Sequence, residues 1–395
     1  MIYDDIVIGS GLSALATVVG LPASRNILIL GGPRPGRFLH YDASGSVPCA
    51  YHGEGGLGIA WHGVIPMMLD SSLAPDATEL KQLLSRFYPA AAEAADIGAA
   101  ELFVPWRPIR PTPLLERLVA RRRGRVTRLP VLATRFSLVA AGVEVDTSAG
   151  THTGRRLWIA AGALHTPELL DRSLGQRVGR DTISDHVLGY VGQVDGANAP
   201  QVRYSRDGMF VSCHVDAGQS ALYTLRPARF GFRQLDYGIE QRAAFGLPTG
   251  GAISKIARAM SAGLLTEAMY TRLGLLAAAP RHSIYAQVEV PEAYSLRTGT
   301  IIELQPRPVT IRARTDAARA ASPFAGTAFS RRSEMYLPGI HLHHSVDVAA
   351  LEASGVNSPG SPVQVVDASI VPRIGCAHHS FRIMLAAWRR ARESS

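Results

Sequence analysis

The 395-residue chain has little cysteine and no long apolar run, and both shortages exclude classes of protein. Its 3 cysteines, Cys49, Cys213 and Cys376, are widely spaced and odd in number, which argues against a disulfide framework or a thiolate metal site. No uninterrupted apolar stretch reaches the length of a membrane span, and no basic leader precedes an apolar core at the N-terminus. We therefore expect a cytoplasmic protein.

Lysine is also scarce, because Lys81 and Lys255 are the only two, and the formal net charge of +9 comes from arginine. The one dense basic cluster covers residues 121–125, whereas nucleic-acid-binding domains gather their charge along one face. We expect no nucleic-acid partner. The apolar share of 47% and the charged share of 18% are typical of a globular protein.

The N-terminus reads as strand, tight turn, helix and strand, over residues 6–8, 9–11, 12–19 and 27–30. The turn carries Gly9-x-Gly11-x-x-Ala14, in the place where a dinucleotide motif must lie. In such a motif Gly9 permits the turn, and Gly11 lets backbone approach a pyrophosphate at the helix start, Leu12 and Ser13. The motif predicts a dinucleotide without choosing between FAD and NAD(P).

The carboxylate that usually holds a ribose hydroxyl after the second strand is missing, since Leu30 runs into Gly31 and Gly32. Arg34 and Arg37 follow, and an arginine there accommodates a 2′-phosphate. This departure favours NADP or a loosely held adenosine.

The rest of the chain alternates between two patterns. Residues 36–65 are glycine-rich and irregular, and we expect a helix over 78–98 and strands over 126–138, 142–147 and 157–161. Residues 190–340 read as strands with one helical block, 253–278, and residues 362–395 return to a buried strand and a helix. The helical block has an apolar face, which packing against a sheet explains better than a membrane surface, so we expect no membrane contact.

The C-terminal segment combines a strand end with paired histidines. The strand ends in Asp367, Ala368 and Ser369, and His378, His379 and Ser380 open the final helix. Paired imidazoles at a strand-to-helix junction suit a proton acceptor beside a cofactor.

Four segments, in order, match the glucose–methanol–choline (GMC) family of FAD oxidoreductases, including pyranose oxidase and gluconate dehydrogenase. They are residues 56–62, residues 126–128 with 158–170, residues 178–180 with Asp185-His186, and the C-terminal segment. The resemblance implies an α/β fold with a discontinuous Rossmann-like FAD-binding domain and an inserted α+β substrate domain built on an antiparallel sheet. The expected boundaries are 1–189 and 341–395 for the FAD-binding domain, with cap elements in 36–120, and 190–340 for the substrate domain.

The resemblance also implies an activity. Family members oxidise an alcohol by removing its hydroxyl proton while a hydride passes to flavin N5. The implied partners are an alcohol substrate, such as a sugar or another polar alcohol, and an electron acceptor, either O2 or a quinone or carrier protein. Two alternatives stay open: a non-redox lyase of the hydroxynitrile-lyase type on the same fold, and an NADP-binding reductase.

The family's site residues transfer to matching positions here. Cofactor contacts are expected from Gly58, His62, Val126, Ala161, Gly162, Asp367, Ala368, His379 and Ser380. Covalent attachment of FAD through His62 is a second option beside simple packing on the flavin. His165 and His186 are read as structural.

Two catalytic histidines are expected, one on each side of the last strand. The second falls on His378, and the first lies in residues 338–345, where the family writes His-x-x-Gly-Thr and this chain does not. His341 aligns best with the Pro-Gly lead-in and His343 is the runner-up; on a strand both would share a face and His344 would point away. No metal site is expected, because no acidic residue has ligand spacing within either histidine cluster.

Overall fold

The computed structural model describes residues 2–32, 37–40, 48–60, 65–66, 74–85, 101–105, 111–122, 124–195, 203–204, 208–216, 218, 221–227, 281–297, 302–323, 336–375 and 379–394. The N-terminal unit forms as the sequence predicts. Strand β1 covers Ile2–Ile8, helix α1 covers Leu12–Gly20 and strand β2 covers Ile27–Leu30. Both strands end in fully buried apolar runs, which is typical of parallel strands covered on both faces.

In the described part of the chain, a 7-stranded sheet has the order β7-β2-β1-β10-β9-β8, with β18 also pairing β10. Strands β7 (Val126–Leu129), β2, β1, β10 (Gly150–Ile159) and β18 (Val363–Val365) run parallel. Strands β8 (Ala133–Val139) and β9 (Gly142–Thr147) extend β10 as an antiparallel meander. The last strand of this sheet thus comes from the far end of the sequence.

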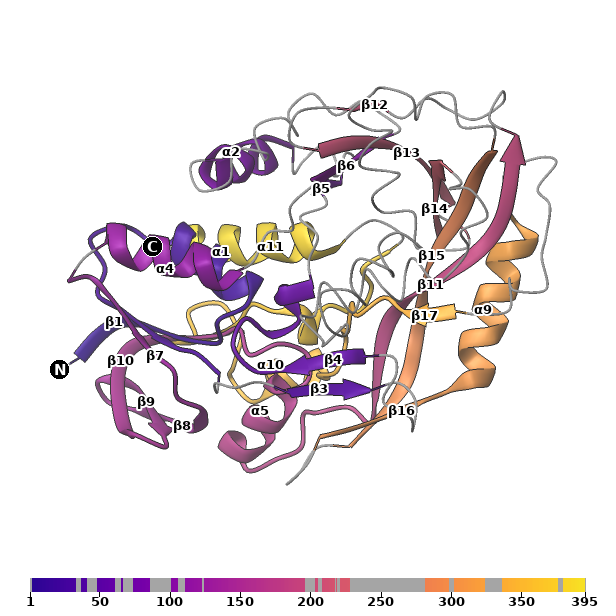
Figure 1. Cartoon of the computed structure of the whole chain (residues 1–395). Coiled ribbons are helices and arrows are strands. Elements are labelled where there is room, and N and C mark those ends of the chain that lie inside the picture. Colours follow the sequence, from indigo (N-terminus) through magenta and orange to yellow (C-terminus); the bar gives the residue numbers. More distant parts are fainter. Residues whose placement is uncertain are drawn as a thin grey trace, which may run out of the picture.

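Helices cover both faces of the parallel strands (Figure 1). Helices α1, α4 (Pro111–Arg121) and α11 (His379–Glu393) share one apolar core with the strands, and α2 (Ala74–Ser85) packs at its edge. Helices α5 (Thr166–Leu174) and α10 (Val348–Ala353) lie with the meander on the opposite face. The carboxyl ends of the strands therefore stay open between these layers, where such folds bind ligands.

A second, antiparallel sheet stands beside the first (Figure 1). Among the described residues its order is β17-β11-β15-β14-β13-β6-β5, with β12 on β13 and β16 on β15. The long strands are β11 (Thr182–Asp195) and β15 (Arg281–Arg297), beside β13 (Gly208–Asp216), β14 (Ala221–Pro227) and β17 (Tyr336–Pro338). The short strands are β5 (Ile65–Pro66), β6 (Glu101–Pro105), β12 (Arg203–Tyr204) and β16 (Glu303–Pro306). Helix α9 (Pro308–Ala320) lies against the long strands.

The predicted fold class, a Rossmann-like α/β unit joined to an antiparallel sheet, is confirmed. The domain boundaries stay a prediction; β11 runs across the expected division at residue 190. Helix α9 was not expected. Residues 36–65, which were expected to be irregular, contain the paired strands β3 (Arg37–His40) and β4 (Pro48–His52) and the 3-10 helix η1 (Gly56–Ala60). The helical block expected at 253–278 lies outside the described residues. None of the described helices combines the length and apolar character that a bilayer span requires.

Candidate active site

A cavity of about 310 Å³ lies at the carboxyl ends of the parallel strands and reaches the edge of the antiparallel sheet. Most of the predicted cofactor and catalytic positions line it, namely Gly9, Gly11, Leu12, Ser13, Gly58, Ala161, Gly162, His341, Asp367, Ala368 and Ser380. These positions come from the N-terminal turn and the start of α1, η1, the end of β10, the segments after β17 and β18, and the first turn of α11. The fold therefore joins distant parts of the chain around one space.

The first turn of α1 opens onto this cavity without a side-chain cap. Its N-cap is Gly11, and the turn contains no acidic residue. Uncapped backbone N–H groups at a helix start attract phosphate oxygens. Gly9 is required for another reason: it has φ +121°, and a Cβ there would lie 2.1 Å from the carbonyl oxygen of Ala160. The turn is thus both closely packed and open to an anion.

The η1 loop is fastened to this turn. The Ser10 hydroxyl accepts a hydrogen bond from the backbone N–H of Gly55 at 2.9 Å. A Cβ at Gly58 would lie 3.0 Å from the Leu12 side chain. The glycines of this loop therefore let it close over the start of α1.

Asp367 ties together the turns on the other side of the cavity. One carboxylate oxygen accepts from the Gly162 N–H at 2.8 Å and the Thr166 hydroxyl at 2.6 Å, and the other accepts from the Ser369 N–H at 2.9 Å. Burial raises the pKa of Asp367, and these hydrogen bonds oppose that rise. Gly162 has φ +82°, and a Cβ at this position would meet no atom within 4 Å, so its free side faces open space.

The residues that line the cavity near the end of β2 differ from those expected from the sequence. Val126 does not line it: this residue is buried against α1 at the opposite end of β7, and residues 131–134 line the cavity instead. The sequence places no carboxylate directly after β2, but Gly32 packs against the backbone of Gly53 and Glu54. Glu54 forms an ion pair with Arg128 of β7. A carboxylate is therefore near this strand end, supplied by the loop after β4.

The segment with the first candidate histidine is not a regular strand. Ile340 has φ +61° and His344 has φ +56°, both in the left-handed region that favours glycine. The expectation that His341 and His343 share one strand face is therefore wrong: His341 lines the cavity, whereas His343 is 0% exposed and does not. His344 takes the glycine place of the family's His-x-x-Gly-Thr pattern when His341 takes the histidine place. The structure thus brings His341, and not His343, to the wall of the cavity.

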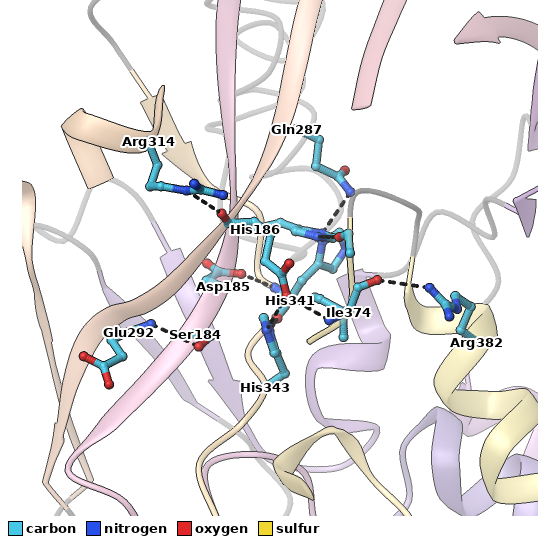
Figure 2. A network of polar contacts seen from close by, with 12 residues as sticks. Ser184, Asp185, His186, Gln287, Glu292, Arg314, His341, His343, Ile374 and Arg382 are labelled. Atoms are coloured by element: carbon cyan, nitrogen blue, oxygen red, sulfur yellow. Dashed lines mark hydrogen bonds and ion pairs between the residues drawn. The ribbon is translucent and has the colours of Figure 1, made fainter. Parts of the chain in front are cut away.

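Asp185 fixes the backbone of His341 (Figure 2). Its carboxylate accepts from the His341 N–H at 2.6 Å and from the Tyr294 hydroxyl at 3.0 Å. Burial raises the pKa of Asp185 to about 7, although these hydrogen bonds and the nearby His343 act to lower it. The His341 imidazole is held separately, by His186, whose Nδ1 lies 3.2 Å from the Nδ1 of His341.

A buried imidazole and a buried carboxylate, His343 and Glu289, lie next to His341. His343 Nδ1 faces the carbonyl oxygen of His341 at 3.0 Å, and His343 Nε2 lies 3.3 Å from Glu289, which also accepts from the Ile374 N–H at 2.8 Å. Burial acts to raise the pKa of Glu289, but the His343 and Ile374 hydrogen bonds and the charge of His343 outweigh it and lower the pKa to about 2. Each ring nitrogen of His343 thus lies within 3.3 Å of a protein oxygen.

The structure describes only some of the other histidines that the sequence analysis named. His62 and His378 lie outside the described residues, and His379 begins α11 with its side chain undescribed. His165 is the N-cap of α5 and lines the cavity. Within the described ranges, no three His, Cys, Asp or Glu side chains are arranged to hold a metal ion.

Three polar residues of the site, His186, Gln287 and Glu289, were not assigned a function from the sequence. They come together because β11 pairs with β15 in a register that sets His186 opposite Glu289. Glu289 is 3% exposed between Val288 and Val290. A charged residue inside an apolar strand pattern was the available signal.

Comparisons with known proteins identify the fold. No family model matches the sequence, and no curated protein matches it. Among solved structures, pyridoxine 4-oxidase from Mesorbium loti is 14% identical over 99% of each chain, with a TM-score of 0.50. An FAD-dependent oxidoreductase from Chaetomium thermophilum (14% identity, TM-score 0.52) and a fungal aryl-alcohol oxidase (15% identity, TM-score 0.52) each match over 98% of both chains.

The chain therefore has the fold of these three enzymes, and each match covers 98–99% of it. The resemblance to the GMC family that the N-terminal turn and four further segments carried is confirmed at the level of the fold.

Proposed function

We propose that the chain is an FAD-dependent oxidoreductase that oxidises an alcohol. The observation that carries this proposal is the position of His341 on the wall of a cavity that also receives the open N-terminus of α1 and the glycine-rich η1 loop. Dinucleotide-binding elements and an imidazole thus meet in one space. The oxidases of the same fold support the class of reaction.

The residues present fit FAD. The uncapped first turn of α1 suits the pyrophosphate, and the open side of Gly162 and the backbone at Ala368 and Ser380 suit the parts nearer His341. Residues 131–134 provide the wall at the adenosine end. When bound, FAD supplies the acceptor for the hydride that leaves the alcohol carbon.

The chain's own part is proton handling. His341 accepts the hydroxyl proton of the substrate, and His378, which directly precedes α11 in the sequence, is the second imidazole of the proposed site. We assign the first role to His341 rather than to His343 because His343 is 0% exposed and does not line the cavity. In this proposal residues 1–189 and 341–395 hold FAD, and residues 190–340 select a sugar or another polar alcohol.

An absorbance experiment tests the proposal. The purified protein, reconstituted with FAD, is expected to show a flavin spectrum that bleaches when an alcohol from a panel is added without oxygen. Whether O2 reoxidises the bleached flavin, or only a quinone-like dye does so, then identifies the electron acceptor. Turnover with an unchanged flavin spectrum would indicate a lyase, and tight NADP binding with no retained FAD would indicate a reductase; either result contradicts the proposal. Acid precipitation tests covalent attachment through His62, which predicts flavin in the pellet.

A further inference from the structure

The ring of His186 is fully enclosed, and each of its nitrogens has a defined partner. His186 is 0% exposed and does not line the cavity. Its Nε2 lies 2.5 Å from the carbonyl oxygen of Gly375, and its Nδ1 lies 2.9 Å from the side-chain nitrogen of Gln287 and 3.2 Å from Nδ1 of His341 (Figure 2). The His186 and His341 rings meet edge to face, with an interplanar angle of 84°, so they do not stack.

These partners determine the protonation of His186. A carbonyl oxygen only accepts, so Nε2 of His186 carries a proton and donates to Gly375. Burial lowers the pKa of His186 to about 4, with the Gly375 hydrogen bond and Glu289 acting against it and His343 acting with it. The ring is therefore neutral at ordinary pH, and its Nδ1 holds a lone pair that accepts from the Gln287 amide.

The same lone pair determines the tautomer of His341. Two facing ring nitrogens form a hydrogen bond only when one of them carries the proton, and Nδ1 of His186 does not, so its single lone pair accepts from both the Gln287 amide and His341, with His341 the longer contact. The proton therefore lies on Nδ1 of His341, and in a neutral ring the lone pair is on Nε2. Since Nδ1 points to the enclosed His186 while His341 itself lines the cavity, the Nε2 edge is the one toward the cavity.

We propose that His186 is a positioning residue that keeps the ring proton of His341 on Nδ1, so that Nε2 is the atom that receives the substrate's hydroxyl proton. This inference rests on the proposed function, because it assumes that His341 is the base. It assigns His186 a task beyond the structural one expected from the sequence.

The charged and titratable groups around the rings of His186 and His341 contact different atoms. Asp185 on β11 accepts from the backbone of His341, Tyr294 on β15 donates to Asp185, and Glu289 on β15 pairs with His343. The centroids of the His186 and His343 rings are 6.5 Å apart. His186 thus contacts the ring of His341 directly, whereas Asp185 holds its backbone N–H and His343 faces its carbonyl oxygen.

Nitrogen NMR of the holoprotein with ¹⁵N-labelled histidines tests the proposal without turnover. The His341 signals, assigned by their loss in His341→Asn, are expected to show a protonated Nδ1 and an unprotonated Nε2. His186→Phe removes the acceptor and is expected to shift His341 toward the other tautomer. His186→Asn places an amide oxygen near the lost Nδ1 and is expected to keep the wild-type tautomer. A wild-type His341 protonated on Nε2, or a tautomer unchanged in His186→Phe, overturns the proposal.

Kinetics provide the second readout. His186→Phe is expected to slow flavin bleaching by roughly 10- to 100-fold with little change in KM, as when a catalytic histidine loses its orienting partner, and His186→Asn to recover most of the rate. The matched control is His152→Phe on β10, which lies outside the cavity lining and is expected to change neither rate nor tautomer. An equal loss in His186→Asn and His186→Phe would indicate a purely structural residue. A wild-type protein that no alcohol bleaches would instead refute the proposed function and leave the NMR result standing.

Discussion

Replacing Asp185 by asparagine is expected to change how the stability of the protein depends on pH. The Asp185 side chain is 0% exposed, and burial raises its pKa from 3.8 to about 7 in the folded state. Asparagine keeps an oxygen for the His341 N–H, and its NH2 group donates to the Tyr294 hydroxyl. The substitution therefore removes the titration while it preserves the shape and both hydrogen bonds.

The size of the change in stability follows from the shift in the pKa of Asp185. A folded-state pKa that is raised gives stability that is present below the unfolded pKa and is lost as the pH rises through the folded one. For Asp185 the window runs from pH 3.8 to about 7. At about 1.4 kcal/mol per unit, the loss amounts to about 4 kcal/mol as an upper bound.

His186 contributes in the opposite direction. Its pKa falls from 6.5 to about 4, so its contribution is present above pH 6.5 and is lost as the pH falls through 4. Between pH 4 and 6.5 the two slopes nearly cancel in the wild-type protein. Asp185→Asn removes one of them, so the variant is expected to gain stability relative to the wild type as the pH rises.

The assay is urea unfolding of the wild type and Asp185→Asn at several pH values between 4 and 8. The difference in free energy of unfolding is expected to move in favour of the variant by roughly 3 to 4 kcal/mol across this range. Comparing the two proteins cancels the titrating groups that do not interact with Asp185. A difference that stays constant with pH would refute the assignment of a buried, titrating Asp185.

Three further predictions concern the site and the core. His341→Ala is expected to lower the limiting rate of flavin bleaching by about 10²- to 10⁴-fold while FAD is retained, and a rate within a few-fold of wild type in rapid mixing would contradict it. Gly9→Ala is expected to abolish soluble protein, because its Cβ would lie 2.1 Å from a carbonyl oxygen, whereas Gly162→Ala meets no atom within 4 Å and is expected to cost about 1 kcal/mol of stability and weaken FAD binding. The yield of soluble protein tests Gly9→Ala, and calorimetry and FAD titration test Gly162→Ala. Trp158→Phe removes the 2.9 Å hydrogen bond to buried Asp5 and is expected to cost about 1 to 3 kcal/mol, seen as a lower Tm.

The parts of the fold that local patterns encode were predictable. The fully buried runs at β1, β2 and β10 and the turn at Gly9 follow from apolar content and from one glycine. Helix α9 was not predictable in the same way, because its sequence is rich in arginine and its helical apolar pattern is weak; its burial depends on the sheet it covers.

The features of the site also differ in whether they depend on local sequence or on tertiary contacts. The predictions of a dinucleotide turn and of His341 as a site residue were possible because their signals lie within a few residues of sequence. The contact between His186 and His341 joins residues 155 positions apart, and it depends on β11 standing beside both β15 and β17. The left-handed conformation of His344 was also invisible, because a histidine there conceals the position where the family has glycine.

The most direct test of the proposed function is the flavin spectrum under anaerobic alcohol. We expect the FAD-reconstituted protein to bleach with at least one alcohol of the panel, and His341→Ala, with the same FAD content, to bleach far more slowly. A protein that cannot be reconstituted with FAD, or one whose bleaching is unaffected by loss of the His341 imidazole, would contradict the proposed function.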